Sequence, residues 1–381
     1  MPAPIAILFA NLKGNLGDFA LLEAALRDCS ARFPGHPLHV YPHAHLPVDE
    51  ERTAAFEAAG VPAFEVKGGT FFAPVWPRLK SFYRFGIWPH LQHRLVVKLE
   101  AASRTDAAKF AEYHAVVSVG GDHFNSMDLG IAMFATTGAV AEAEQRVAMY
   151  PFSVNSQVFD FNRQADLHRY FARLKQPPVV RDSITQGVLA RMGIEAHLGA
   201  DCVYSLHDHA GEIEPLAKRD ASRILLVATE GTGRALEATL SAAVERLGDA
   251  RPVELLTTCD PEDRPAFTAV AAKYGIAYRA PLTWQEMIAE LKASSLVVTN
   301  RLHCLILGSI AECTLLPITD RQKSEAFARD SGVPHAIARL GDLDPARAQA
   351  VITDGAAQRS SVTAFRDTCR ASTWSPFALD D

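Results

Sequence analysis

Residues 5–18 read IAILFANLKGNLGD, and this stretch decides the fold. Six apolar residues in a row, residues 5–10, are typical of a strand that is buried on both faces of a parallel sheet. A glycine-containing loop follows at residues 11–18, and residues 19–33 have the apolar spacing of a helix. A strand, a tight glycine loop and a helix together indicate the opening unit of a Rossmann-like domain.

The same pattern of strands and helices recurs along the chain. Further strands of a first sheet are predicted at residues 38–42, 115–119, 146–150 and 178–183. A second series of strands is predicted at residues 223–228, 253–257, 296–299 and 315–318, with helices that include residues 284–293 and 301–313. Strand–helix alternation in both halves predicts an α/β protein with two Rossmann-like parallel-sheet domains that face each other across a cleft.

The domain boundary is predicted from composition. Residues 204–220 contain His, Asp, Gly and Pro without a clear period, as linkers often do. We expect an N-terminal domain over residues 1–205, a linker over 206–220, a C-terminal domain over 221–345, and a helical tail over 346–381 that crosses back onto the first domain.

Bulk composition excludes several classes of protein. The chain has 381 residues, 48% of them apolar, which suits two globular domains. Its formal net charge of -6 makes nucleic acid an unexpected partner. The six cysteines lack C-x-x-C or zinc-ligand spacing, so we expect reduced, mostly buried thiols in a cytosolic protein and no metal site. We expect neither a signal peptide nor a membrane span, because the first ten residues read as a strand and no apolar stretch reaches about 20 residues.

Residues 70–98 stand out because they combine aromatic and basic residues with no acidic residue. This mixture is typical of a segment that makes peripheral contact with an anionic membrane surface. The alternative is a segment whose aromatic side chains pack on the first domain. Both interpretations stay open.

Candidate ligand-binding residues come directly after the predicted strands. Ligands of parallel α/β sheets bind beyond the carboxyl ends of the strands, so polar side chains at these positions are expected to line the cleft. They are Asn15, Asp18, Asp122, His123, Arg181, Asp182, Glu230, Asn300, Arg301 and His303.

The segment 299–308 gives the sharpest signal. Arg301 and His303 come where a strand ends and a helix begins, and a helix N-terminus offers unpaired N–H groups and a partial positive charge. Arginine suits carboxylate or phosphate, and histidine can donate to phosphate or move a proton near neutral pH. The pattern indicates a site for a small dianion, or else a surface helix end with incidental charge.

The ordered motifs of the chain resemble the polysaccharide pyruvyl transferase family. Residues 298–317, headed by Arg301-Leu302-His303, look like its C-terminal signature, and residues 14–18 look like its G-N-x-G-D loop. The remaining matches are residues 117–121, residues 180–183 with the helix that follows, Asp201, and residues 320–323. The chain departs from the family pattern at Asp122-His123, Ser183 and Thr319.

The resemblance implies the fold of the two-domain, GT-B type glycosyltransferases. It also implies transfer of a pyruvyl group from phosphoenolpyruvate to a hydroxyl pair of a polysaccharide or lipid-linked oligosaccharide, as a ketal. No cofactor is implied, because phosphoenolpyruvate is a co-substrate. The expected location is the cytoplasm, with peripheral contact at the inner membrane face through residues 70–98.

The resemblance also implies roles for residues of the cleft. His303 is expected to act as general acid or phosphate ligand, Arg301 to act beside it, and Asp122 to act as a base for a sugar hydroxyl. The expected donor-binding residues are Arg181, Arg301, Leu302, His303 and Lys323. The expected acceptor-binding residues are Asn15, Asp18 and His123. For Lys323, a solvated surface position is an equal alternative.

Two other functions remain open. A nucleotide-sugar glycosyltransferase of the same architecture would need a carboxylate for ribose hydroxyls, and Glu312 lies in roughly the required part of the sequence. A non-catalytic homologue that binds anions or glycans is the second alternative. Assays with phosphoenolpyruvate against nucleotide sugars separate the first alternative from the pyruvyl transferase, and calorimetry with phosphoenolpyruvate tests the second.

Overall fold

The computed structural model of the chain describes most of both halves. The described residues are 2–42, 48–67, 108–124, 138, 140, 147–154, 168, 171–172, 177–211, 213–215, 223–248, 252–372 and 375–376. The aromatic and basic segment 70–98 lies outside the described residues, and so does part of the predicted linker.

The first half is built around a five-stranded parallel sheet with the order β3-β2-β1-β4-β6. Its strands are β1 (Ile5–Ala10), β2 (Leu38–Pro42), β3 (Phe64–Val66), β4 (Ala115–Ser118) and β6 (Val147–Met149). All six residues of β1 are buried, as expected for the central strand of a sheet that is covered on both faces. The helix α1 (Leu16–Arg32) begins directly after the glycine loop, and Asn15 caps it by accepting a hydrogen bond from the Gly17 N–H.

A smaller four-stranded sheet, with the order β5-β7-β8-β9, completes the first half. Its strands are β5 (Gly121–Phe124), β7 (Phe152–Val154), β8 (Val179–Val180) and β9 (His197–Leu198), and α7 (Ser183–Arg191) follows β8. The chain passes from β4 into β5 through the paired glycines. A Cβ on Gly120 would lie 2.4 Å from the Pro151 carbonyl oxygen, and Gly121 has a φ of +128°, so both positions require glycine.

The second half has its own five-stranded parallel sheet with the order β12-β11-β10-β13-β14. Its strands are β10 (Ile224–Val227), β11 (Val253–Leu256), β12 (Tyr278–Arg279), β13 (Leu296–Thr299) and β14 (Leu315–Pro317). Its helices are α8 (Arg234–Gly248), α9 (Asp260–Tyr274), α10 (Trp284–Lys292), α11 (Leu302–Ile310) and α12 (Gln322–Ser331). The predicted pair of parallel α/β sheets is therefore confirmed.

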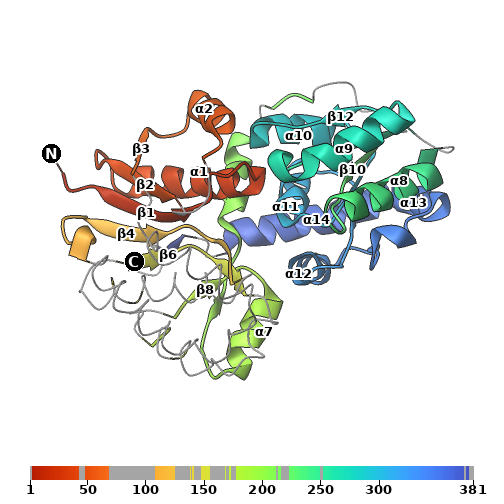
Figure 1. Cartoon of the computed structure of the whole chain (residues 1–381). Coiled ribbons are helices and arrows are strands. Elements are labelled where there is room, and N and C mark those ends of the chain that lie inside the picture. The colour runs from red at the N-terminus through yellow and green to blue at the C-terminus, as the bar shows by residue number, and fades with distance from the viewer. Residues whose placement is uncertain are drawn as a thin grey trace, which may run out of the picture.

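The two halves form lobes that lie side by side (Figure 1). Helix α1 packs on α10 and on the 3-10 helix η3 (Cys202–His209), and one hydrophobic cluster contains residues of both large sheets. Buried polar contacts add to this interface. The Trp284 indole N–H donates to Glu23 at 2.7 Å, and Arg52 of α2 (Glu50–Ala58) donates to the Pro281 and Leu282 carbonyls at 2.9 Å. The lobes are thus joined by a shared apolar core.

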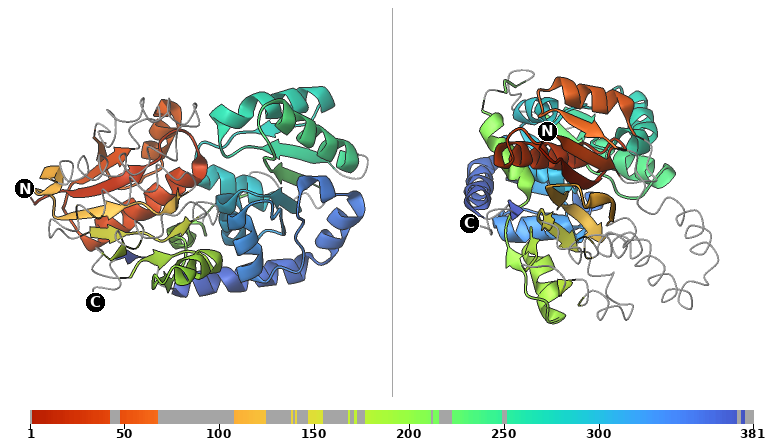
Figure 2. Two further views of the ribbon diagram at one scale, coloured as in Figure 1. Left: turned by 60° about the horizontal axis from the view of Figure 1, so that its bottom comes forward. Right: turned by 90° about the vertical axis from the view of Figure 1, so that its left-hand side faces the viewer.

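The end of the described chain forms two helices, α13 (Pro345–Thr353) and α14 (Gly355–Ala371). Figures 1 and 2 show α14 running from the second lobe toward the first. It packs on α11, α12 and η3, and Ser375 beyond it donates to Asp28 of α1 at 2.6 Å. Within the described residues, no helix has the length and apolar character that crossing a bilayer requires.

Candidate functional site

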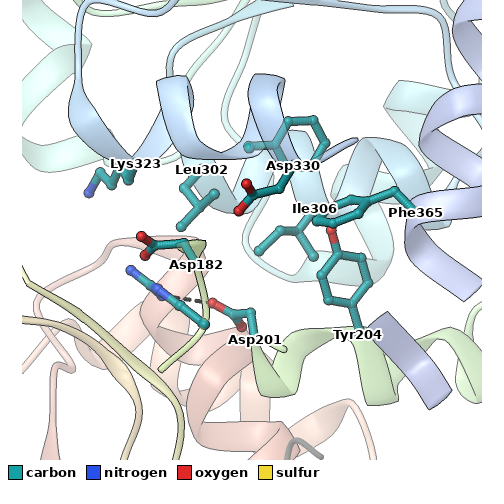
Figure 3. A pocket seen from close by; sticks show the side chains of 10 residues that line it. Asp182, Asp201, Tyr204, Leu302, Ile306, Lys323, Asp330 and Phe365 are labelled. Atoms are coloured by element: carbon teal, nitrogen blue, oxygen red, sulfur yellow. Dashed lines mark hydrogen bonds and ion pairs between the residues drawn. The ribbon is translucent and has the colours of Figure 1, made fainter. Parts of the chain in front are cut away.

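A pocket lies between the two lobes (Figure 3). Its cavity volume is about 20 Å³, so the pocket is narrow in this structure. The first lobe contributes the segment after β8 and the start of η3, and the second lobe contributes α11, α12 and α14. The lining residues are Arg181, Asp182, Asp201, Tyr204, Leu302, Ile306, Lys323, Phe327, Asp330 and Phe365.

The pocket has a charged end and an apolar end. In Figure 3, Lys323 and Asp182 lie toward one end, Tyr204 and Phe365 lie together at the other, and the carboxylates of Asp201 and Asp330 lie between them. Tyr204 packs edge-on against Phe365 with ring centroids 6.2 Å apart, and burial raises the pKa of its hydroxyl well above the usual value. A ligand with a charged group and a small apolar group matches this division.

Two helix N-termini meet at the charged end. Leu302, the first residue of α11, and Lys323, in the first turn of α12, both line the pocket. The residues that precede these helices are Arg301 and Arg321, and an arginine side chain has no acceptor with which to cap a helix. The first-turn N–H groups and the partial positive charge of both helices therefore favour an anion at this end.

Arg181 is a buried residue of the pocket lining and bonds to Asp201 and Ser153. Its Nη1 donates to Asp201 Oδ2 at 2.7 Å, and its Nε donates to Ser153 Oγ at 2.5 Å. Burial alone would raise the pKa of Asp201, but the Arg181 guanidinium and the nearby His303 hold it well below its usual range. The pair therefore stays ionised, and it fixes the guanidinium in one position.

His303 also lies beside Asp201, but it does not line the pocket itself. Its Nε2 is 3.7 Å from Asp201 Oδ2, so Arg181 and His303 approach the same carboxylate oxygen. On the other side of the ring lies the glycine loop, because a Cβ on Gly17 would come within 2.0 Å of His303 Nδ1. The structure thus brings together Arg181, Lys323, Leu302 and His303, four of the predicted donor residues.

Asn15 and Asp18 are joined to this group through the glycine loop. Asp18 Oδ2 accepts hydrogen bonds from Asn11 at 2.6 Å and from Asn15 at 3.0 Å. Burial raises the pKa of Asp18, and the charges of His303 and Lys323 oppose that rise. Asp18 thus interacts electrostatically with both residues.

Arg301 takes a different direction from the one expected. Its Nη2 forms an ion pair with Asp263 of α9 at 2.5 Å, and Arg301 is absent from the pocket lining. Asn300 is fully buried and bonds to the Thr229 backbone and to Asp320, so it holds the ends of β10 and β13 together. The role of Arg301 in donor binding stays a prediction.

The remaining predicted residues lie at separate places in the fold. Asp182 caps α7 by accepting from the Thr185 N–H at 2.7 Å, and Glu230 accepts from the Leu340 N–H at 3.2 Å. Asp122 and His123 belong to β5, but their side chains lie outside the described residues. Glu312 follows the C-terminal end of α11 and pairs with Arg366 at 2.8 Å, so it lies at the opposite end of that helix from the pocket.

Sequence reasoning gave no role to two carboxylates of the site. Asp201 follows β9, a two-residue exposed strand that has no apolar run to reveal it. Asp330 lies in the last turn of α12 and accepts from the Ser183 N–H at 3.0 Å and from its hydroxyl at 2.5 Å. The rule that polar residues follow strands would have selected Asp201 if β9 had been recognised, whereas no local signal marks Asp330.

A known family matches most of the chain. The family model described as polysaccharide pyruvyl transferase matches residues 15–319. No protein with a curated description matches the chain in sequence.

Solved structures with the same fold include two UDP-GlcNAc 2-epimerases. The enzyme from Neisseria meningitidis, bound to UDP-GlcNAc, has 9% identity and a TM-score of 0.56, with 95% of this chain and 94% of that chain covered. The Methanocaldococcus jannaschii enzyme, in complex with UDP-GlcNAc and UDP, has 12% identity and a TM-score of 0.52, with 92% of each chain covered.

A plant protein extends the similarity. Phytolacca americana UGT2, complexed with UDP-2fluoro-glucose and pterostilbene, has 11% identity and a TM-score of 0.53, with 97% of this chain and 95% of that chain covered. At these identities the similarity shows the fold alone. The predicted GT-B type architecture is confirmed.

Proposed function

Because this chain belongs to the polysaccharide pyruvyl transferase family, we propose that it transfers the pyruvyl group of phosphoenolpyruvate to two hydroxyls of a glycan. The acceptor is a polysaccharide or its lipid-linked precursor, and the product is a cyclic ketal. No cofactor takes part, because phosphoenolpyruvate supplies both the carbon skeleton and the leaving group.

One observation carries the choice of donor. Two helix N-termini that begin after arginines, together with Arg181 and Lys323, line a small pocket between the lobes, beside the carboxylates of Asp182, Asp201 and Asp330. Phosphoenolpyruvate places a phosphate and a carboxylate on three carbons, so it needs several positive groups within a small volume. Its methylene is the small apolar group that the other end of the pocket would accept.

The proposed reaction balances without an oxidant or reductant. A proton adds to the methylene carbon of the donor, which becomes a methyl group, while a sugar hydroxyl attacks the adjacent carbon and loses its proton. The second hydroxyl then displaces the phosphate from that carbon and closes the ketal. One inorganic phosphate leaves for each ketal that forms.

The residues of the site suit separate parts of this sequence. Arg181 and Lys323 bind the phosphate and carboxylate, and Leu302 forms the wall against the three-carbon skeleton. His303, between Gly17 and Asp201, is the proposed acid or phosphate ligand. Asn15 and Asp18 lie on the acceptor side, and Asp122 and His123 of β5 are the further candidates there.

The test is turnover of phosphoenolpyruvate with an acceptor glycan, followed by phosphate release and the mass of the glycan. His303→Ala is expected to lower kcat by about 10²–10⁴-fold, as loss of a positioned acid–base group does. Arg301→Ala is the second variant. Loss of activity in it would show that the Arg301 guanidinium, which pairs with Asp263 in the structure, contacts the donor during turnover. If both variants keep wild-type turnover, the assignment of these residues is wrong.

The nucleotide-sugar alternative is checked in the same assay. The fold is shared with proteins that hold UDP-sugars, but the carboxylate required by that alternative, Glu312, pairs with Arg366 at the distal end of α11. Transfer from a nucleotide sugar, with none from phosphoenolpyruvate, would overturn the proposal. Calorimetry that detects no phosphoenolpyruvate binding would favour a non-catalytic homologue.

A further inference from the structure

Asp201 is the point at which two proposed donor residues meet. It is 2% exposed and precedes η3, and its Oδ1 accepts from the Val203 N–H at 3.0 Å. Its Oδ2 accepts from Arg181 Nη1 at 2.7 Å and also faces His303 Nε2. A carboxylate oxygen has room for two donors, so Arg181 leaves a position for the imidazole.

The imidazole of His303 has an incomplete set of contacts. Its Nε2 is buried and has no hydrogen-bond partner among the residues that the structure describes. The 3.7 Å distance to Asp201 Oδ2 exceeds a hydrogen bond, but a movement of less than about 1 Å would close it. Catalytic hydrogen bonds are often this long before substrate binds.

We propose that Asp201 is a positioning residue of the proposed transferase, whose single Oδ2 orients the His303 imidazole through Nε2 while it fixes the Arg181 guanidinium. The carboxylate accepts from Nε2–H and so keeps the proton of the neutral ring on Nε2. One buried carboxylate thereby positions both Arg181, which binds the donor, and His303, which supplies the proton. The expected effect on turnover rests on the proposed function. The expected effect on the His303 ring does not.

Other charged groups also face His303, and they set the scale of the effect. Asp18 of α1 and Lys323 of α12 surround it together with Arg181, and Arg301 lies on its own helix. Burial raises the pKa of Asp18, whereas Arg181 helps to hold that of Asp201 far below the usual range. Asp201 therefore stays ionised beside His303.

The decisive variant is Asp201→Asn, which keeps the shape of the side chain and removes its charge. The ¹⁵N shifts of the neutral His303 ring are expected to change toward a mixture of the two tautomers, because the carboxylate that accepts from Nε2 is lost. KM for phosphoenolpyruvate is expected to rise, because Arg181 loses its ion pair. Wild-type ¹⁵N shifts of the His303 ring in this variant would overturn the proposal.

The matched control is Asp182→Asn on the same pocket wall. The Asp182 carboxylate accepts from the N–H and the hydroxyl of Thr185, and asparagine also caps helices well. The ¹⁵N shifts of His303 in this variant are expected to match those of the wild type. An equal change in both variants would mean that the carboxylate of Asp201 has no specific part.

A measurement on the wild-type protein keeps the proposal testable if Asp201→Asn does not fold. The ¹⁵N shifts of the neutral His303 ring report which nitrogen carries the proton. The proposal expects Nε2, and a proton on Nδ1 would contradict it. The tautomer does not depend on turnover. A protein that fails to use phosphoenolpyruvate would therefore refute the proposed function and leave this test unaffected.

Discussion

Gly17 lies in the first turn of α1, in the position where the His303 ring leaves no room for a side chain. A Cβ there would come within 2.0 Å of His303 Nδ1 and 2.5 Å of its Cγ. The conflict is with a ring that is packed on its other side by Asp201, so the imidazole cannot swing away freely. A glycine in the first lobe thus fixes where a side chain of the second lobe can lie.

Gly17→Ala is therefore expected to displace His303 and to lower kcat by about 10²–10⁴-fold, as loss of its proposed role would. The overpacking is expected to cost about 1–3 kcal/mol in the free energy of unfolding. Steady-state kinetics and thermal denaturation check both values. Gly341→Ala is the control, because a Cβ at Gly341 meets nothing within 4 Å. Wild-type kcat in Gly17→Ala would show that the ring position is unimportant.

At the scale of single residues, the sequence predicts the backbone position of a side chain better than the direction in which its polar end points. Arg301 and His303 were placed correctly at the head of a helix, because the strand before them and the apolar run after them are strong local patterns. The direction of the Arg301 guanidinium depends on Asp263, which is 38 positions away in the chain and carries no local signal. Long polar side chains follow their tertiary partners, and one sequence does not reveal these.

Helix α14 is the element that closes the apolar end of the pocket. Its buried residues, Gly355, Gln358, Val362, Arg366 and Cys369, recur at helical spacing. Phe365 beside them lines the pocket and packs edge-on against Phe327 with ring centroids 5.7 Å apart. The tail is thus part of the site wall and also part of the core.

Phe365→Ala is expected to destabilise the protein by about 2–4 kcal/mol, at or below the usual range for a core phenylalanine because this side chain is only partly buried. It is also expected to raise KM for the donor, since it opens the pocket wall. Denaturant unfolding and kinetics measure the two effects. Thr368→Ala, at an exposed position of the same helix, is expected to stay within about 0.5 kcal/mol of wild type. Equal stability of the two variants would contradict the assignment.

The elements that sequence reasoning found are those with long apolar runs. The predicted strands at residues 5–10, 38–42 and 296–299 match β1, β2 and β13 residue for residue. The strands β9 and β12 have two residues each and are largely exposed, so pairing with a neighbour stabilises them more than their own burial does. For the same reason the separate small sheet of the first half was not foreseen, because three of its four strands have only two or three residues.

The whole molecule joins its lobes in two chemically different ways. Around α1, η3, α10 and α11 the contact is a shared hydrophobic cluster with the buried Trp284–Glu23 hydrogen bond. Across the pocket, α7 and α12 meet through the polar Ser183–Asp330 contacts, and Gln322 donates to the Val154 carbonyl at 2.6 Å. Polar contacts can be replaced by hydrogen bonds to water at little cost in free energy, whereas opening a shared hydrophobic core exposes apolar surface to water. Any opening of the lobes is expected to begin on the α7–α12 side.

Asp330→Ala is expected to loosen that side alone. Loss of a hydrogen bond to a charged group is worth about 1.5–3 kcal/mol, so amide exchange at Ser183 is expected to quicken by about 10–100-fold. Hydrogen–deuterium exchange measures this, with α1 and α10 expected to keep their wild-type protection. Asp367→Ala, which removes an exposed carboxylate on α14, is the control. Faster exchange throughout the molecule would mean that the contact supports the global fold instead.

The six cysteines of the chain give this molecule an internal chemical reporter. None of them forms a disulfide in the structure and all are buried, and burial raises the pKa of Cys29, Cys304 and Cys369 to about 12. Alkylating reagents react with the thiolate and need access to it. The native protein is therefore expected to resist them until local unfolding exposes a thiol. The rate at which each thiol is labelled then measures how often its surroundings come apart, without any introduced probe.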